Sequence, residues 1–282
     1  MPEGVSPELL VVRLLVISGV FFWLSLLLSQ KTAGALNVGS RWLEWRPLPH
    51  DLTFRMVLAF FSGYVLQQLF GLLLFSLQLV DKLPIGMIVL LPMIFFQGLM
   101  TFVLYSHLHR SGLNPLEVLG MEEPFRVRDQ IWGLVGFCMC LPLVAMSAKL
   151  TEWLYITFRW ELENQPILEM VSNVDGWMNW VSLFLLVGFI GPLLEEVVFR
   201  GFLHTWLHQK LGLVPGLLLQ AILFAVIHAH TASLLPLFCL AVLLGLVYIY
   251  TRRLMACVWV HALYNTMTLI VTFFFSGGEM AG

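Results

Sequence analysis

The chain has 282 residues, of which 59% are hydrophobic and 11% are charged, and its formal net charge is -2. About a quarter of the residues of a soluble domain are charged, so this composition excludes an ordinary soluble globular protein. The near-neutral charge and the lack of basic stripes argue against a nucleic acid partner.

Long apolar segments recur along the chain, and each is long enough to cross a lipid bilayer. The predicted spans are 10–30, 54–80, 84–106, 130–148, 178–209, 214–230, 233–250 and 254–275. They are continuous and do not alternate as the ten-residue strands of a membrane barrel do, which favours helices. We therefore predict an all-α protein, a polytopic transmembrane helical bundle of about eight membrane spans surrounded by the lipid bilayer.

The first apolar segment, Leu14 to Ser29, has the length of a signal peptide. It follows Glu3, Glu8 and a single basic residue, Arg13, whereas a signal peptide begins with a basic region. We therefore expect this segment to remain as a membrane span.

The basic residues predict the orientation of the spans. With the N-terminus outside, nine of the fifteen Lys and Arg residues fall in inside loops and three fall outside, while Arg13, Arg55 and Arg200 lie within predicted spans. Such an excess is typical of cytoplasmic loops. The prediction is an integral, multi-pass membrane protein with its N-terminus outside, and the lack of a retention signal favours a bacterial inner membrane.

Three regions are predicted: an N-terminal four-span membrane region (1–148), an interfacial linker (149–177) and a C-terminal catalytic membrane core (178–282). The linker is predicted to be an interfacial helix plus loop, because aromatic side chains that favour the membrane–water interface cluster in and next to it. They are Trp153, Tyr155, Trp160, Trp177 and Trp180.

Polar side chains inside the C-terminal spans mark the candidate site. An ionisable group at the centre of a membrane costs roughly 2.5–3.5 kcal/mol, so each one requires a reason. The fifth, sixth and eighth predicted spans contain such groups, and the first four have no comparable set. The residues are Glu195, Glu196, Arg200, His228, His261 and Asn265.

Helical spacing predicts that these residues converge. Glu196 and Arg200 are four apart with the acid first, which favours an ion pair, whereas Glu195 points about 100° away. Glu195 and His228 each lie roughly 20 Å along a helix from the turn at 211–215, so an antiparallel pair of helices would place them side by side. Asn265 lies roughly 18 Å beyond Arg253, which is at the same membrane face.

These side chains include the groups that hydrolysis by an activated water requires. A carboxylate such as Glu195, together with His228, can act as a general base toward water. His261 and Asn265 can donate hydrogen bonds to an oxyanion. No HExxH or GxSxG motif is present. A divalent metal at Glu195, His228 and His261 is an alternative, because such groups can ligate zinc; we favour a site with no cofactor.

Three motifs carry a family resemblance: Glu195-Glu196-x-x-x-Arg200, Phe224-x-x-x-His228 and His261-x-x-x-Asn265. They resemble the motifs of the CAAX protease and bacteriocin-processing (CPBP) family, which includes the type II CAAX prenyl endopeptidases. The resemblance covers about 178–275. It implies a glutamic-type intramembrane protease that cleaves a membrane-anchored protein or peptide.

In that resemblance, the catalytic residues are Glu195 and His228, which activate water, and His261 and Asn265, which form the oxyanion site. Glu196 and Arg200 support them.

Two other functions compete with proteolysis. One is a non-catalytic membrane scaffold or immunity protein of the same fold. The other is a proton-coupled transporter, because intramembrane Glu and His can relay protons. An inverted-repeat transporter would carry matching segments in both halves of the chain, and the polar residues lie in one half. The sequence carries no signal for an oligomeric state.

Overall fold

The computed structural model describes residues 50–79, 83–161, 174, 176–228 and 230–276. Within these ranges the chain forms helices and turns and contains no strand. The main helical elements are α3 (His50–Ser76), α4 (Ile85–Met93), η2 (Ile94–Gly98), α5 (Leu99–Arg110), α6 (Pro115–Val118), α7 (Val127–Phe158), α9 (Trp177–Leu185), η3 (Leu186–Ile190), α10 (Gly191–Glu196), η4 (Val197–His204), α11 (Thr205–Leu211), α12 (Leu213–Ile227), η5 (Thr231–Ser233), α13 (Leu234–Thr251) and α14 (Leu254–Ser276).

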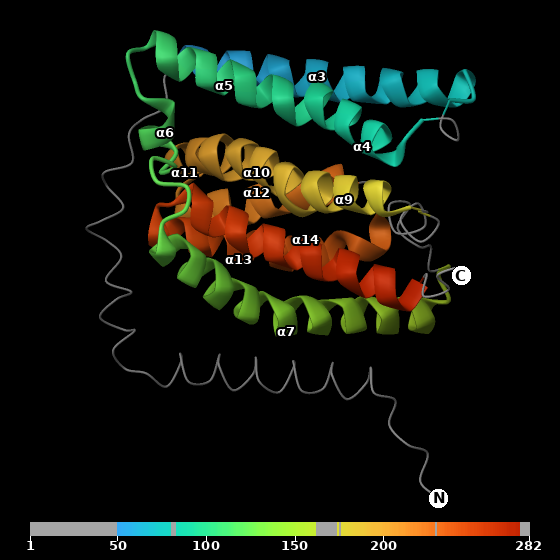
Figure 1. The fold of residues 1–282 in the computed structure, drawn as a ribbon. Helices are drawn as coiled ribbons and strands as arrows, with labels where there is room; N and C mark the ends of the chain where they lie inside the picture. Colours follow the sequence, from blue (N-terminus) through green and yellow to red (C-terminus); the bar gives the residue numbers. More distant parts are fainter. Residues whose placement is uncertain (1–49, 80–82, 162–173, 175, 229, 277–282) are drawn as a thin grey trace, which may run out of the picture.

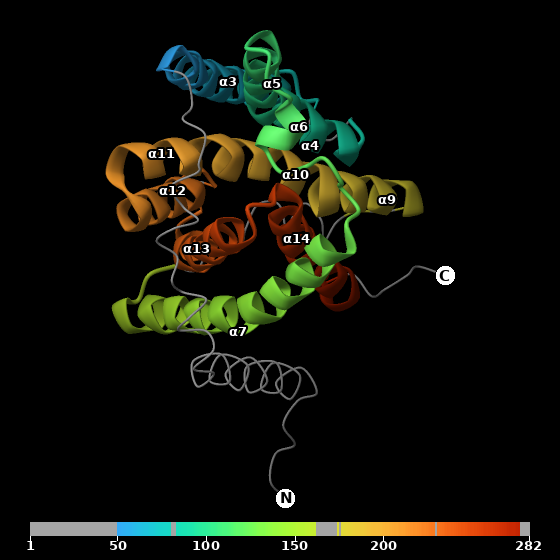
Figure 2. The same ribbon diagram turned by 90° about the vertical axis from the view of Figure 1, so that its left-hand side faces the viewer.

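The helices stack in layers that two perpendicular views show consistently (Figures 1 and 2). The α3 helix and the α4–α5 segment form one outer layer, and α7 lies on the opposite side of the molecule. Between them lie α9 to α12, followed by α13 and α14. The segment with the predicted site is therefore enclosed between the N-terminal hairpin and α7.

The predicted all-α, polytopic architecture is confirmed. Six helices of the described chain are long and apolar enough to cross a membrane. They are 55–74, 85–110, 127–158, 177–211, 231–251 and 254–274. The sixth predicted span is the shorter helix α12, whose 15 residues extend about 22 Å. The first predicted span lies outside the described residues, and the orientation and three-region division remain predictions.

The fourth predicted span was too short. Helix α7 continues ten residues past 148 and ends at Phe158, where Arg159 adopts a left-handed conformation with φ 55°. Lys149 and Glu152 pair across one helical turn at 2.6 Å, so these polar residues extend the helix. The start of the predicted interfacial linker is therefore the end of α7.

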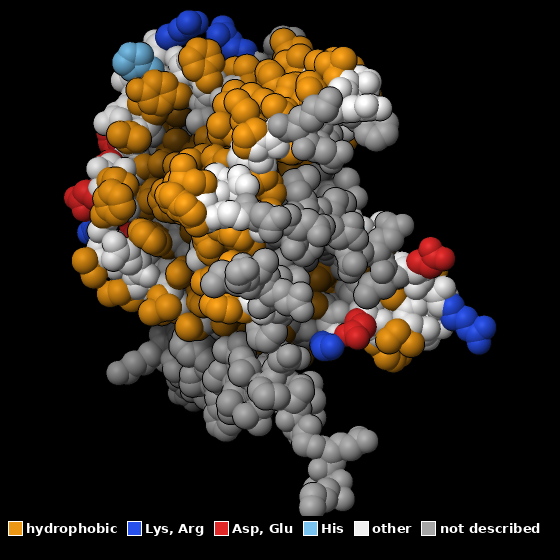
Figure 3. Space-filling model, turned by 45° about the vertical axis from the view of Figure 1, so that its right-hand side comes forward, with side chains coloured by type: hydrophobic (Ala, Val, Ile, Leu, Met, Phe, Trp, Pro, Cys, Tyr) orange, Lys and Arg blue, Asp and Glu red, His pale blue; other side chains and the backbone are white. Residues whose placement is uncertain are grey.

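Hydrophobic side chains cover most of the visible described surface, and charged side chains lie near its margins (Figure 3). Leu72, Phe102 and Ile131 are each more than half exposed. An apolar surface of this extent is suited to contact with lipid tails and not with water.

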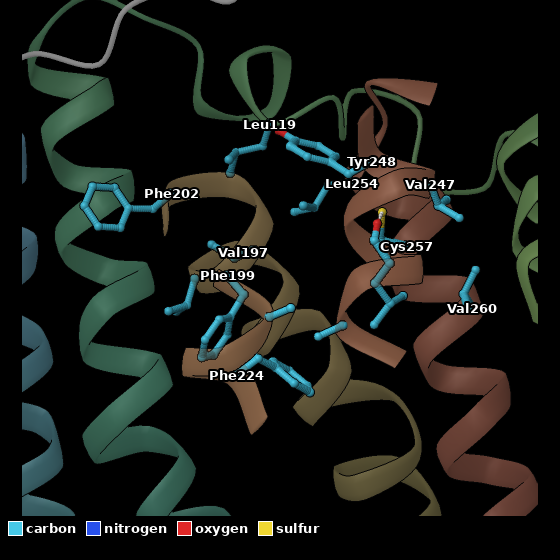
Figure 4. Close-up of a cluster of buried hydrophobic side chains, with 14 of the residues drawn as sticks. Leu119, Val197, Phe199, Phe202, Phe224, Val247, Tyr248, Leu254, Cys257 and Val260 are labelled. Carbon is cyan, nitrogen blue, oxygen red and sulfur yellow. Dashed lines mark hydrogen bonds between the residues drawn. The ribbon is translucent and has the colours of Figure 1, made fainter. Parts of the chain in front are cut away.

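The buried core lies where η4, α12, α13 and α14 meet (Figure 4). Phe199 and Phe224 are fully buried and their rings meet edge to face with centroids 5.0 Å apart. Cys257 and Val260 of α14 are also fully buried. This cluster fixes the relative positions of the three helices that carry the predicted motifs.

A polar cluster fixes the turn between α13 and α14. Arg253 donates hydrogen bonds to Asp129 at 3.0 Å and to Glu122 at 2.6 Å. Burial opposes the charge of Arg253, but the hydrogen bonds and negative charges of these two residues outweigh it and raise its pKa. The adjacent backbone N–H of Leu254 donates to the carbonyl of Leu119. The turn is thereby attached to the loop before α7.

Candidate active site

Three buried side chains form the centre of the candidate site. Glu196 and Arg200 are fully buried, and His261 is 3% exposed. Nη1 of Arg200 donates to Oε1 of Glu196 at 2.8 Å, and Nδ1 of His261 lies 2.9 Å from the same oxygen. The predicted ion pair between Glu196 and Arg200 is therefore present and also holds a histidine from α14.

Arg200 has two further contacts that balance its burial. Its Nη2 donates to the carbonyl of Ala241 at 3.2 Å. Its guanidinium lies over the Phe224 ring, 4.9 Å from the centroid, a geometry that stabilises a cation. A buried charge is tolerated when it is paired and hydrogen-bonded in this way.

Glu195 follows the same helix but has a different environment. Its side chain is 17% exposed, and its Oε2 lies 3.8 Å from Nε2 of His261. Its Oε1 accepts from Nε2 of Gln97 at 3.4 Å. Adjacent positions on one helix therefore place the two glutamates in different environments, as the spacing predicted. Glu196 is fully buried and pairs with Arg200, whereas Glu195 lies at the edge of the site.

His261 lies between the two glutamates, and its tautomer follows from its partners. A carboxylate only accepts hydrogen bonds, so Nδ1 carries the hydrogen that is shared with Glu196. Nε2 then faces Glu195 as a lone pair in the neutral ring, or as a donor in the imidazolium form. The predicted role of His261 as an oxyanion donor therefore requires the protonated ring.

His228 lies just beyond the end of α12 and is exposed. Its Nδ1 is 2.7 Å from the carbonyl of Phe224. Because a carbonyl only accepts, Nδ1 carries the hydrogen and the neutral ring keeps a lone pair on Nε2. This is the form that a general base requires.

The predicted direct pairing of Glu195 with His228 is not made among the described contacts. Glu195 meets His261 and Gln97, whereas the His228 ring packs against Phe224 at 4.8 Å. The Phe224 ring also lies 5.9 Å from that of His261. His228 is the C-cap residue of α12, which ends at Ile227, so its side chain leaves from the helix end. The predicted common depth of Glu195 and His228 remains a prediction.

Asn265 lies one turn beyond His261 on α14, and its Nδ2 donates to the carbonyl of Val187 at 3.0 Å. Val187 is in the wide π-helical turn η3, where the N–H of Gly191 bonds the carbonyl of Leu186, five residues earlier. In the same five-residue pattern, the N–H of residue 192 would donate to the carbonyl of Val187. Residue 192 is a proline, which has no N–H. The Val187 carbonyl is thus available to Asn265.

Asn265 was predicted as an oxyanion donor, and the structure commits one of its amide hydrogens to the backbone. The amide group has two hydrogens, so the second can serve a further acceptor. The bond to Val187 fixes the orientation of the amide.

Gln97 is the site residue whose partner the sequence did not reveal. Its position in an apolar span predicts an interhelical hydrogen bond, and the structure shows that the acceptor is Glu195. The choice of partner depends on how the N-terminal hairpin docks on the C-terminal helices, which no local spacing encodes.

The structure thus connects Glu195, Glu196, Arg200 and His261 directly, and links His228 to His261 through Phe224. Among the described residues, no group of three or more His, Cys, Asp or Glu side chains is arranged to hold a metal ion. The choice between a cofactor-free site and the alternative metal set remains a prediction.

Comparison with known proteins supports a protease family. Residues 177–267 match the family model described as Type II CAAX prenyl endopeptidase Rce1-like. This match confirms the resemblance drawn from the three motifs. No solved structure matches the chain.

Three curated relatives are distantly similar. The "Putative membrane peptidase YdiL" of Bacillus subtilis is 22% identical over 141 residues, which are 50% of this chain and 55% of YdiL. The UPF0177 protein YbdI of Lactococcus lactis is 26% identical over 53% of this chain and 80% of its own length. The membrane-embedded CAAX protease MroQ of Staphylococcus aureus is 22% identical over 73% of this chain and 85% of its own length. The match thus spans about half the length of YdiL.

Proposed function

We propose that this chain, whose residues 177–267 match the Rce1-like family model, is a glutamate-dependent intramembrane endopeptidase. Its substrate is a membrane-associated or lipid-modified protein. Glu195 and His228 activate the attacking water, and His261 and Asn265 stabilise the oxyanion. Glu196 and Arg200 hold the site together.

The observation that carries this proposal is the unequal environment of two adjacent glutamates. Glu196 is fully buried and accepts hydrogen bonds from Arg200 and His261 at one oxygen. Glu195 is 17% exposed, and its partners are the amide of Gln97 and, at 3.8 Å, His261. Glu195 is therefore the carboxylate that can reach a water and take its proton.

The reaction needs no covalent intermediate with the protein. The water oxygen bonds to the peptide carbonyl carbon while Glu195, assisted by His228, takes its proton. The carbonyl electrons move to oxygen, where protonated His261 and the second amide hydrogen of Asn265 stabilise the charge. When the carbon–nitrogen bond breaks, the proton passes to the departing amine, so protons and electrons balance.

The surroundings of the site favour a substrate held by the membrane. The site lies within helices that have the length and composition of membrane spans, and the outer face of the bundle is apolar. A peptide delivered by a lipid anchor or its own apolar segment would reach this depth without first dissolving in water. We propose that cleavage occurs near the C-terminus of the substrate or next to a membrane segment.

The test compares membrane protein termini in cells that carry the wild type, Glu195→Gln or His228→Ala. We expect at least one new terminus in the wild type that both variants lack. Glu152→Gln is the matched control, because Glu152 is in an exposed ion pair at the end of α7. Normal cleavage by Glu195→Gln would refute the mechanism. A biological phenotype that survives both active-site substitutions would favour the scaffold or immunity function.

A further inference from the structure

The N-terminal hairpin contributes a side chain to the candidate site from outside the family match. Gln97 precedes residue 177, where that match begins, by eighty positions. Its Nε2 lies 3.4 Å from Oε1 of Glu195, the oxygen on the other branch of the carboxyl from the one that faces His261. Hydrogen bonds in sites without substrate are often this long.

The placement of Gln97 depends on an irregular helix. Gln97 lies in η2, a π-helical turn of a kind that is frequent at functional sites. Pro92, five residues earlier, has no N–H to donate within this helix. The wide turn therefore sets the direction in which the side chain of Gln97 points.

Close packing against α3 holds this turn in place. A Cβ added to Gly63 would lie 2.8 Å from the carbonyl oxygen of Phe95 and 3.2 Å from Cα of Phe96. Phe96 itself is 3% exposed, and its ring meets that of Phe60 edge to face at 5.2 Å. Gly63 thus permits the backbones of α3 and η2 to approach closely. This close packing holds Gln97 facing the C-terminal helices.

We propose that Gln97 is a positioning residue for the base of this protease. This inference rests on the proposed function. The amide of Gln97 holds Oε1 of Glu195 and thereby directs Oε2 toward Nε2 of His261. The side chain acts through Glu195, so its removal should slow the chemical step and leave substrate binding nearly unchanged.

The first test is the kinetics of Gln97→Met, which keeps the approximate length of the side chain and removes the donor. A hydrogen bond to a charged group corresponds to about a tenfold to hundredfold change in rate. We therefore expect kcat to fall at least about tenfold, with KM within about twofold of the wild type. Gln68→Leu is the control: it replaces an exposed glutamine on α3 of the same hairpin and should leave both constants unchanged.

Gln97→Glu provides a second readout that a structural role would not give. The charged and titratable groups near Glu195 are His261, the Glu196–Arg200 pair that His261 contacts, and His228 on the other side of the Phe224 ring. A carboxylate at position 97 repels that of Glu195, but a protonated carboxyl can donate a hydrogen bond to it. Gln97→Glu should therefore lose activity at neutral pH and recover part of it as the pH falls, whereas Gln97→Met should not recover.

An infrared measurement separates this inference from the proposed function. The carboxyl band of Glu195 is the band that disappears in Glu195→Gln, and it requires no substrate. We expect Gln97→Met to shift that band and Gln68→Leu to leave it in place. If the band shifts in a protein without protease activity, the proposed function fails and the positioning contact stands. An unshifted band, or unchanged kcat in Gln97→Met, would overturn the assignment of Gln97.

Discussion

Replacement of Arg200 by methionine should strongly destabilise the protein, because it leaves a fully buried carboxylate with one donor. The substitution removes a 2.8 Å hydrogen bond to Glu196, a 3.2 Å hydrogen bond to Ala241 and the contact with the Phe224 ring. These contribute about 1.5–3, about 1 and about 1–2 kcal/mol. Their sum agrees with the roughly 3–5 kcal/mol lost when one partner of a buried ion pair is removed.

The double variant Arg200→Met/Glu196→Gln tests the cause of that loss. It removes both charges, and the new amide oxygen can still accept from His261. Because replacing a whole buried pair is often close to neutral, we expect the double variant to be more stable than Arg200→Met. Lys149→Met is the control: it breaks an exposed pair of 2.6 Å and should change stability by less than about 1 kcal/mol.

The assay is reversible unfolding in mixed detergent micelles, followed by tryptophan fluorescence. A loss below about 1 kcal/mol for Arg200→Met would refute the reasoning. So would strictly additive effects of the two substitutions, because coupled partners in contact should give a measurable interaction energy.

Three further predictions concern packing, the α13–α14 turn and metals. Gly133→Ala should destabilise the protein by about 1–3 kcal/mol, because the new Cβ would overlap Trp259 of α14. Gly71→Ala meets open space and should stabilise the protein by about 0.5–1 kcal/mol. Unfolding midpoints of the two variants that do not move in opposite directions would contradict this prediction. Arg253→Met should cost about 2–4 kcal/mol, because Asp129 is 1% exposed and would lose its cation; a variant of normal stability would exclude that role. Cleavage should survive treatment with a strong chelator, and zinc-dependent recovery of a lost activity would favour the metal alternative.

The features that the sequence predicts correctly are those set by local physics. A span needs about 20 apolar residues, so hydropathy locates the helices. The pair formed by Glu196 and Arg200 follows from four-residue spacing on one helix, and the different directions of Glu195 and Glu196 follow from the angle between successive residues.

The features that it misses depend on how separate helices meet or on irregular turns. The amide of Gln97 finds Glu195 only when the N-terminal hairpin docks. The pairing of Asn265 with the Val187 carbonyl depends on a π-helical turn, and hydropathy carries no signal for such a turn. The helix expected after residue 148 is continuous with the fourth span up to Phe158, and this continuity was missed because polar residues suit either a helix end or a loop.

The wide turn at 186–190 holds one residue more than the α-helical winding on either side of it. A helix that takes up an extra residue in a π-helical turn keeps nearly the same rotational phase before and after the turn. Deleting one residue there should therefore restore ordinary winding and leave Glu195 and Glu196 facing their present neighbours. A homologue with intact motifs and a one-residue gap at this point would thus keep both the signature of the site and its geometry.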